Sequence, residues 1–355
     1  MTGPGLRAFG FSGYVAESFA PFAGEDLVPG RVVAGHSRLM RVRTEDGETL
    51  AGVAGGLRYQ ARGPEDRPAV GDWVALRRRE GQRAVVQAIL PRRTAFVRRA
   101  AGKRAVAQVL AANVDTVFLV MGLDGDFNLR RIERALVLAW ESGALPVVLL
   151  NKTDVCDDVP GRRAAIEAVV PGVPVCAIAA KAGEGLDSLS PWLVPARTVA
   201  LLGSSGVGKS TLVNRLLGCE KQKTRDVLEA DQRGRHTTTH RELILLPGGA
   251  LLLDTPGLRE LQLWSDEGSL QATFGDVHEL SCACRFTDCR HGTEPGCAVR
   301  AAVEEGRLDH ARLDSFRKLQ AELRALEIRE DPLKRREERS RWKAIHKSLR
   351  QPKRG

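Results

Sequence analysis

A glycine-rich segment, Gly203–Ser210, is the feature that most constrains the fold of this 355-residue chain. It reads GSSGVGKS and matches the pattern G-x-x-x-x-G-K-[ST] of a phosphate-binding loop. An apolar run, Val199–Leu202, precedes it, and Thr211–Leu217 follows with the apolar spacing of a helix that Gly218 would end. A loop that joins a strand to a helix N-terminus can direct backbone N–H groups at phosphate oxygens. The segment therefore predicts a nucleotide-binding α/β domain.

Two side chains of this segment carry specific chemistry. We expect Lys209 to contact the β- and γ-phosphates and the hydroxyl of Ser210 to bind Mg²⁺. The residues expected around the phosphates are Gly203, Ser204, Ser205, Gly206, Val207, Gly208, Lys209, Ser210 and Thr211.

A second motif, Asn151-Lys152-Thr153-Asp154, points to guanine as the base. It follows the apolar run Pro146–Leu150, which reads as a strand. The carboxylate of Asp154 can accept hydrogen bonds from the N1–H and 2-amino groups of guanine, whereas adenine presents a lone pair at N1. A preference for GTP over ATP follows, since the wrong base would leave this carboxylate unpaired.

Other residues should complete the base site. We expect Asn151 to tie neighbouring loops together, Lys152 to lie over the base, and Thr153 to belong to the same binding loop. The backbone N–H groups of Ala179-Ala180-Lys181 would contact the guanine O6, which adds Ala180 and Lys181 to the GTP-binding residues.

The remaining GTPase signals lie downstream of the phosphate loop. Asp254 opens the sequence Asp-Thr-Pro-Gly and would orient Mg²⁺ through water, while the N–H of Gly257 would sense the γ-phosphate. Among the threonines at 237–239, we choose Thr238 as the hydroxyl that closes over Mg²⁺. Leu258 stands where Ras-like enzymes carry a water-orienting Gln. Because leucine cannot hold a nucleophilic water, we hypothesise that His236 or a partner supplies the polar group; the alternative is that His236 is only a loop residue.

The order of the motifs is inverted relative to ordinary GTPases, in which the phosphate loop comes first. Here the Asn-Lys-x-Asp motif precedes the loop, and Asp-x-x-Gly comes last. The same sheet can form if the usual termini, which lie close together, are joined and the chain is opened elsewhere. We expect the joint near Ser190–Arg197, in a circularly permuted GTPase domain over residues 104–265. Alternating strands and helices predict a mainly parallel sheet with helices on both faces.

The N-terminal part has a different pattern of predicted secondary structure. After an arm over residues 1–30, short β-type stretches separated by turn signals predict a small barrel of the OB-fold type over residues 31–100. These stretches are Arg31–Val33, Leu39–Val42, Thr49–Val53, Asp72–Leu76 and Ala84–Ile89. The net charge of +10 makes a polyanionic partner such as RNA plausible, with Arg77–Arg79 as a backbone-binding segment. A basic but inert surface, and a merely solvated turn at Arg77–Arg79, stay open as alternatives.

A cysteine cluster near the C-terminus predicts a metal site. Five candidate ligands compete for the four positions around a tetrahedral Zn²⁺: Cys282, Cys284, Cys289, His291 and Cys297. We choose Cys284, Cys289, His291 and Cys297, which would make a structural site in a helical module over residues 270–332. The helix expected over Leu308–Leu326 belongs to it, and a basic tail, 333–355, follows. The other cysteines, Cys156, Cys176 and Cys219, read as ordinary buried thiols.

No apolar run is long enough to span a bilayer, and the N-terminus lacks the apolar stretch of a signal peptide. We therefore expect a cytoplasmic monomer with no membrane partner.

Taken together, these motifs resemble the ribosome small subunit-dependent GTPase A family (RsgA, also called YjeQ). The resemblance covers roughly residues 30–330 and rests on five quoted motifs: GSSGVGKST at 203–211, NKTD at 151–154, DTPG at 254–257, RHTTT at 235–239 and CRFTDCRHGTEPGC at 284–297. It implies an OB-fold, a circularly permuted GTPase domain and a zinc module whose ligands match the four chosen, which leaves Cys282 as the extra cysteine. It also implies late maturation of the 30S subunit, contact with 16S rRNA, and GTP hydrolysis stimulated by the subunit. One departure is Ala179, where the family usually has Ser; the backbone contacts survive that change.

Two alternatives remain at this point. The chain could be an RNA-binding switch that binds GTP with negligible turnover, which Leu258 motivates. It could also be a permuted GTPase that acts on the large subunit or another RNA.

Overall fold

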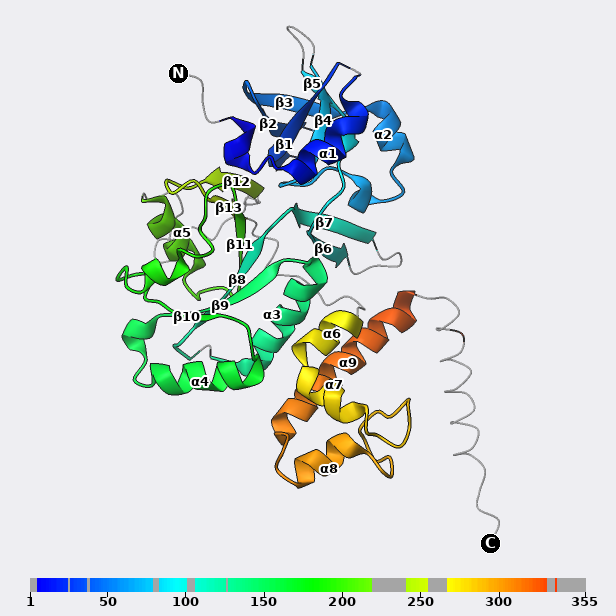
Figure 1. Cartoon of the computed structure of the whole chain (residues 1–355), viewed down its shortest axis with the longest axis vertical. Coiled ribbons are helices and arrows are strands. Elements are labelled where there is room, and N and C mark those ends of the chain that lie inside the picture. The colour runs from blue at the N-terminus through cyan, green and yellow to red at the C-terminus, as the bar shows by residue number, and fades with distance from the viewer. Residues whose placement is uncertain are drawn as a thin grey trace, which may run out of the picture. The chain divides into compact units, whose positions relative to one another are not determined.

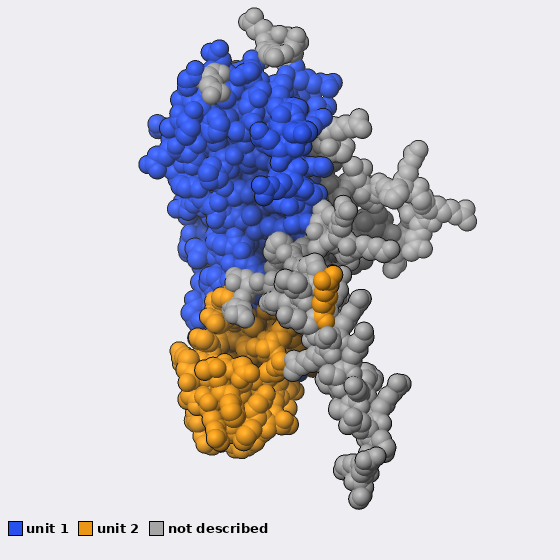
Figure 2. Space-filling model, turned by 90° about the vertical axis from the view of Figure 1, so that its right-hand side faces the viewer, with its two compact units in different colours: residues 1–262 blue, residues 263–355 orange. Residues whose placement is uncertain are grey.

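The computed structural model describes residues 5–24, 26–36, 39–78, 83–100, 106–125, 127–218, 241–254, 267–330 and 336. The chain divides into two compact units, residues 1–262 and 263–355, which are coloured separately in Figure 2. Each unit is described by itself below, with the element labels of Figure 1. Among the helices of the described ranges, none combines the length and apolar character needed to cross a membrane.

A closed five-stranded barrel opens the first unit. Its strands are β1 (Leu27–His36), β2 (Leu39–Thr44), β3 (Gly47–Val53), β4 (Trp73–Arg77) and β5 (Ala84–Ile89), and they pair in the cycle β1-β2-β3-β5-β4-β1. Alternating side chains such as Val42, Val74 and Val86 fill its interior and are fully buried. All five strands predicted from the sequence are confirmed. Between β3 and β4 lie the helix α2 (Gly55–Gln60) and the short turn η3 (Pro64–Asp66).

The expected arm over residues 1–30 needs correction. Its described part forms η1 (Leu6–Phe9), α1 (Gly13–Phe19) and η2 (Ala20–Phe22), and β1 already starts at Leu27. Leu6 and Val15 pack with Trp73 and Leu90 in one buried cluster. These elements could not be predicted from the sequence, because their apolar residues follow neither a helical nor a strand period and only their shared packing on the barrel orders them.

A two-stranded antiparallel hairpin, β6 (Ala95–Ala100) with β7 (Val106–Ala112), follows the barrel, and the sequence did not predict it. The described part of the chain then alternates strands with helices. These elements are β8 (Thr116–Gly122), α3 (Leu129–Ser142), β9 (Leu145–Asn151), η4 (Thr153–Val155), α4 (Val159–Val169), β10 (Val175–Ala177), η5 (Leu186–Leu189), β11 (Thr198–Leu202), α5 (Lys209–Leu217), β12 (Arg241–Leu245) and β13 (Leu251–Asp254).

The strands after the hairpin form the α/β part of the sheet, in the order β10-β9-β8-β11-β13-β12. All neighbouring pairs are parallel except β12 with β13, which form an antiparallel hairpin, and β12 also pairs with β1 of the barrel. Every residue of β8 is buried. Phe118 and Val120 pack in the same core as Leu212 of α5, so the alternate residues of β8 point to the opposite face, against which α3 packs. Helices therefore cover both faces, as predicted.

The helix boundaries have identifiable causes. Asn128 caps the N-terminus of α3 by accepting a hydrogen bond at Oδ1 from the N–H of Arg131 (3.3 Å), and Gly143 ends the helix in the left-handed conformation. Gly218 ends α5 in the same way (φ 67°).

Over the described residues of the second unit, all regular elements are helices, and an irregular loop joins α7 to α8. Its elements are α6 (Glu267–Thr273), α7 (Gly275–Ser281), α8 (Ala298–Glu304) and α9 (His310–Glu330). Phe274 packs edge-on against Phe316 of α9 with ring centroids 5.4 Å apart. Arg312 lies over Phe274 and pairs with Asp276 (3.0 Å), which fixes α9 against α7. The helix expected over 308–326 is confirmed and extends further.

Candidate functional site

The phosphate loop joins the buried strand β11 to α5, as the sequence predicts. Gly203 leaves the strand so close to β8 that a Cβ atom there would lie 2.3 Å from the carbonyl oxygen of Val120. Gly208 caps α5 in the left-handed conformation (φ 95°), where a side chain would be strained. The glycines of the motif are thus required by a close approach at one end and by backbone conformation at the other.

Lys209 is almost buried, with 7% of its surface exposed. Its ammonium group donates to the carbonyl oxygen of Gly203 (2.6 Å) and to that of Ser204. The loop carbonyls therefore hold the charge at the loop itself, where phosphate oxygens are predicted to bind. Its contact with β- and γ-phosphates stays a prediction.

Asn151 connects the two nucleotide-binding loops. It ends β9 with only 3% of its surface exposed. Its side-chain amide donates from Nδ2 to the carbonyl oxygen of Val207 (2.8 Å) and accepts at Oδ1 from the N–H of Ala180 (2.9 Å). The predicted tie between loops is present. This tie is a second reason why position 208 requires glycine, since a Cβ atom there would lie 2.3 Å from Nδ2 of Asn151.

The base-recognition motif continues into the turn η4. Lys152 adopts the left-handed conformation (φ 68°), and its ammonium group pairs with the carboxylate of Asp124, in the loop after β8. Thr153 donates its N–H to the carbonyl oxygen of Ile178 (3.3 Å), and Asp154 is exposed. The Asp154 carboxylate is thus open to a ligand, as guanine recognition would need.

The expected role of Ala180 changes in one respect. Its N–H donates to Asn151, so a guanine O6 would have to share that donor or use the N–H of Lys181. The loop itself is tight, because the N–H groups of Gly183 and Glu184 both donate to the carbonyl oxygen of Ala179 (2.8 and 3.2 Å).

The magnesium and switch residues are only partly described. Ser210 lies in the first turn of α5, and Asp254 ends β13, which runs parallel to β11 with Leu253 opposite Ala200. A hydroxyl at the start of the helix that follows β11 and a carboxylate at the end of the adjacent parallel strand β13 are oxygen ligands of the kind that Mg²⁺ prefers, so these residues fit the ion. His236, Thr238, Gly257 and Leu258 lie outside the described residues.

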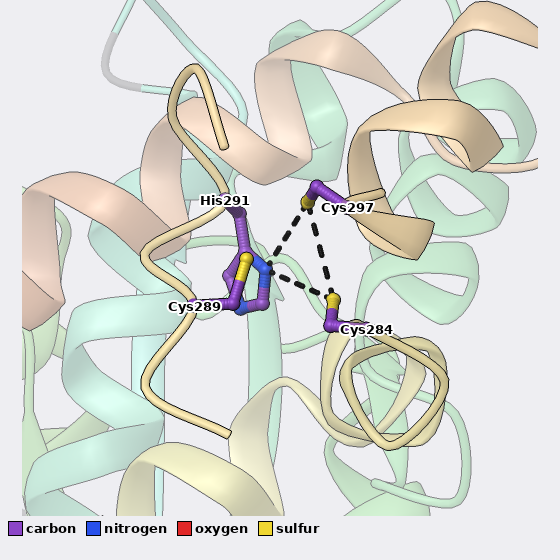
Figure 3. Close-up of side chains that lie close together, drawn as sticks. All are labelled: Cys284, Cys289, His291 and Cys297. Atoms are coloured by element: carbon purple, nitrogen blue, oxygen red, sulfur yellow. Dashed lines mark hydrogen bonds between the residues drawn. The ribbon is translucent and has the colours of Figure 1, made fainter. Parts of the chain in front are cut away.

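Four side chains of the second unit converge in a cluster that could hold a metal ion: Cys284, Cys289, His291 and Cys297 (Figure 3). Their ligand atoms lie within 4.8 Å of one another. Nδ1 of His291 is 3.6 Å from Sγ of Cys284 and 3.5 Å from Sγ of Cys297, and those two sulfur atoms are 4.0 Å apart. Tetrahedral Zn²⁺, with Zn–S of about 2.3 Å and Zn–N of about 2.0 Å, separates its ligand atoms by about 3.5–3.8 Å. The cluster fits such an ion.

The pKa values of three of the candidate ligands bear on whether they can bind a metal ion. Burial lowers the pKa of His291, which favours the neutral imidazole that binds metals. Burial opposes ionisation of Cys284, but hydrogen bonds from the backbone at Val299 and Ala298 and from the neighbouring thiols together outweigh it and lower the pKa of that thiol. Burial raises the pKa of Cys289 to about 11, so this thiol would be deprotonated at neutral pH only when it binds a cation, which stabilises the thiolate.

The other cysteines stand apart from the cluster. Cys282 is exposed and does not belong to the group of converging ligands, in line with its place as the extra cysteine. Cys176 is buried as expected, whereas Cys156 is only partly buried, because it follows the exposed turn η4. Cys219 lies outside the described residues.

Comparison with known proteins decides the family. The sequence profile described as RsgA GTPase matches residues 89–264. The chain is 50% identical over 355 residues to a protein of Opitutus terrae named "Small ribosomal subunit biogenesis GTPase RsgA", with 97% of both chains covered. A protein of the same name from Streptomyces coelicolor is 43% identical and covers 99% of this chain and 96% of its own.

The chain belongs to the RsgA GTPase family.

Solved structures agree with the family. The crystal structure of YjeQ from Thermotoga maritima superposes with a TM-score of 0.63 at 29% identity and covers 84% of this chain and 98% of that one. A second structure, titled as YloQ, "a circularly permuted GTPase", has a TM-score of 0.59 at 24% identity, covering 85% and 96% of the two chains. The circular permutation inferred from motif order is thus confirmed as the fold of this RsgA family member.

The structure also places residues near the RsgA nucleotide site that the sequence did not single out. Arg131, in the first turn of α3, donates from Nη1 to the hydroxyl of Ser204 in the phosphate loop (2.8 Å). Asp124 anchors Lys152, as described above. Both come from the β8–α3 segment, which carries no nucleotide motif, so no local pattern could have revealed them. They reach the site only because β8 lies beside β9 and β11 in the sheet.

Proposed function

We propose that this chain binds and hydrolyses GTP as a biogenesis factor of the small (30S) ribosomal subunit. The relatives named above carry that function in their names. The 50% identity to the Opitutus terrae protein, over 97% of both chains, supports assigning the same function to this chain. The observation that carries the proposal is the Asn151 amide, which joins the phosphate loop to the base loop in a chain of this family. This arrangement supports GTP as the ligand of this site.

We assign the nucleotide contacts as follows. The loop from Gly203 to Thr211 would hold the phosphates, with Lys209 on the β- and γ-phosphates. Asp154 would read the guanine N1–H and 2-amino groups, and the loop at Ala180 and Lys181 would read O6. Lys152 would lie over the base beside Asp124. Fixed N–H donors and a buried ammonium group stabilise charge that develops on the phosphates without reorganisation.

Hydrolysis requires a water aligned with the γ-phosphate. We assign Asp254, Gly257 and Thr238 to the switch elements that respond to this phosphate, and we keep His236 as the polar group that compensates for Leu258. Magnesium bound through Ser210 and Thr238 would neutralise charge on the phosphate oxygens.

The Cys3His cluster is proposed as a structural zinc site, one ion per chain. All four tetrahedral positions would be filled by protein ligands, which leaves no place for substrate. Its task would be to hold the loop between α7 and α8 rigid.

The finer assignments complete the proposal. We propose that the barrel, whose strands run from Leu27 to Ile89, binds 16S rRNA. The other proposed parts are the permuted GTPase domain over 104–265, the zinc module over 270–332 and a basic tail over 333–355. The first helices would belong to the barrel and not to a separate arm. The chain would act as a monomer in the cytoplasm, where the 30S subunit is assembled.

The test is GTP turnover by the purified chain alone, with 30S subunits and with 50S subunits. We expect stimulation by 30S subunits only, together with GTP-dependent co-sedimentation. Stimulation by 50S subunits would support the large-subunit alternative, and binding without turnover would support a switch that does not hydrolyse GTP. The His236→Ala variant should lose the stimulated rate; an unchanged rate would exclude His236 as the compensating group.

Base recognition has its own test. The Asp154→Asn variant should bind GTP less tightly and xanthosine triphosphate more tightly, because the carboxamide can donate to the xanthine 2-oxo group. Equal GTP affinity in both proteins would contradict the assigned role of Asp154.

A further inference from the structure

Arg215 makes contacts that the proposed function does not explain. It lies in α5, six residues after Lys209, and its side chain is exposed. Its guanidinium group donates from Nε to the carbonyl oxygen of Ala180 (3.2 Å) and from Nη2 to the carbonyl oxygen of Lys181 (2.5 Å). These are the two residues whose peptide groups are assigned to guanine O6. The helix that begins at the phosphates therefore also reaches the base loop.

The two contacts fix the orientation of peptide groups in that loop. A carbonyl and the N–H of the next residue belong to one rigid plane and point in opposite directions. Holding the carbonyl of Ala180 on the Arg215 side therefore directs the N–H of Lys181 away from Arg215. On the other side of the loop, Asn151 holds the N–H of Ala180. The planar fork of an arginine suits two adjacent carbonyls, which a lysine ammonium group cannot match in the same way.

We infer that Arg215 is a positioning residue for guanine recognition, which clamps the Ala180–Lys181 loop so that the N–H of Lys181 faces O6 of the base. The inference rests on the proposed GTP-binding function. Its described contacts are with the carbonyl oxygens of Ala180 and Lys181, so Arg215 would act through the loop and not on the nucleotide itself. Loss of the clamp should therefore speed nucleotide release and weaken the reading of O6, while the groups that read the 2-amino position stay intact.

The experiment uses the full chain and three variants: Arg215→Ala, Arg215→Lys and Arg163→Ala. Arg163 is the matched control, because it is an exposed helix arginine whose described contact is a surface ion pair with Glu167 on α4. Release of a fluorescent GDP is followed by stopped flow, and affinities for GDP, IDP and ADP are measured by competition. We expect Arg215→Ala to release GDP about tenfold faster, which corresponds to about 1.4 kcal/mol. Arg163→Ala should match the wild type.

The base series separates positioning from a general loss of structure. IDP shares O6 with GDP and lacks the 2-amino group, so Arg215→Ala should weaken GDP and IDP by the same factor. ADP lacks O6, so its affinity should stay unchanged and discrimination against adenine should fall. Equal weakening of all three nucleotides would overturn the inference in favour of a structural or electrostatic role. Arg215→Lys should be intermediate; wild-type behaviour would show that only the charge matters.

A loop-specific readout completes the test. Hydrogen exchange at the amides of residues 179–185 should accelerate in Arg215→Ala without nucleotide, while exchange in β9 and β11 stays as in the wild type. Unchanged exchange and unchanged GDP release would overturn the inference even if the wild type binds GDP well. If the wild type bound no guanine nucleotide, the proposed function itself would fail, so the two failures are distinguishable.

Discussion

Replacement of Asn151 is the most informative perturbation of the nucleotide site. Its amide is buried and makes one bond as a donor, to Val207 (2.8 Å), and one as an acceptor, from Ala180 (2.9 Å). Asn151→Ala removes both bonds and leaves a buried N–H and a buried carbonyl without their partner. Each such group costs about 1–3 kcal/mol, so we expect a loss of about 3 kcal/mol in the free energy of unfolding.

Asn151→Asp tests the same contacts with almost no change in volume. The bond from Ala180 can survive, but a carboxylate oxygen now faces the carbonyl oxygen of Val207 where Nδ2 donated. This repulsion and burial raise the pKa of the new carboxyl in the folded state. A protonated carboxyl can donate to Val207, so its stability contribution is present below the unfolded pKa of about 3.9. It is lost as pH rises through the folded pKa, at about 1.4 kcal/mol for each unit of upward shift.

The assay is urea unfolding at several pH values between 4 and 8, followed by the fluorescence of the five tryptophans; one of them, Trp192, packs edge-on against Phe118 in the core of the α/β sheet. Asn151→Ala should be destabilised by a similar amount throughout, whereas Asn151→Asp should approach the wild type toward pH 4. Asn128→Asp is the control, since Asn128 is exposed and its capping oxygen is retained. A loss below 1 kcal/mol in Asn151→Ala, or a pH-independent Asn151→Asp, would refute the reasoning.

Three further predictions address the loop, the barrel and the cluster. Gly208→Ala should lower nucleotide affinity more than tenfold in equilibrium titrations, because its Cβ would meet Asn151, whereas Gly206→Ala has open space around its Cβ and should show only the backbone strain of about 1 kcal/mol. Arg31→Met should lower the free energy of unfolding, measured by thermal unfolding, by about 3–5 kcal/mol, since the buried guanidinium of Arg31 donates to three carbonyl oxygens and one hydroxyl; a loss below 1 kcal/mol would contradict this. Cys297→Ser should abolish the one zinc per chain measured by atomic absorption, and Cys282→Ser should keep it; retained zinc in the first variant would exclude Cys297 as a ligand.

The Arg31 contacts show one feature that tertiary structure alone decides. Arg31 lies in β1 of the barrel, yet it donates to Thr198 at the start of β11 (2.8 Å), the strand that leads to the phosphate loop. Burial lowers its pKa to about 10, although Asp115 and Asp72 oppose this. Nothing in the sequence around Arg31 predicts a partner 167 residues away, because a single buried arginine has no periodicity or spacing to read.

By itself, the sequence determined the chemistry of the motifs and the local elements that carry them. The phosphate loop, the Asn-Lys-x-Asp motif and the Cys3His spacing each depend on residues close together in the chain, so glycine conformations, strand periods and ligand spacing could be read directly. The motif order even revealed the permutation. Only the tertiary structure decided that the N-terminal helices join the barrel, that the β6–β7 hairpin forms, and that Arg131 and Arg215 reach the nucleotide loops. The two arginine contacts join residues far apart in sequence, and they form because burial of both faces of the sheet places α3 and α5 beside the phosphate and base loops. The N-terminal helices and the hairpin depend on packing against the rest of the first unit, which no local pattern encodes.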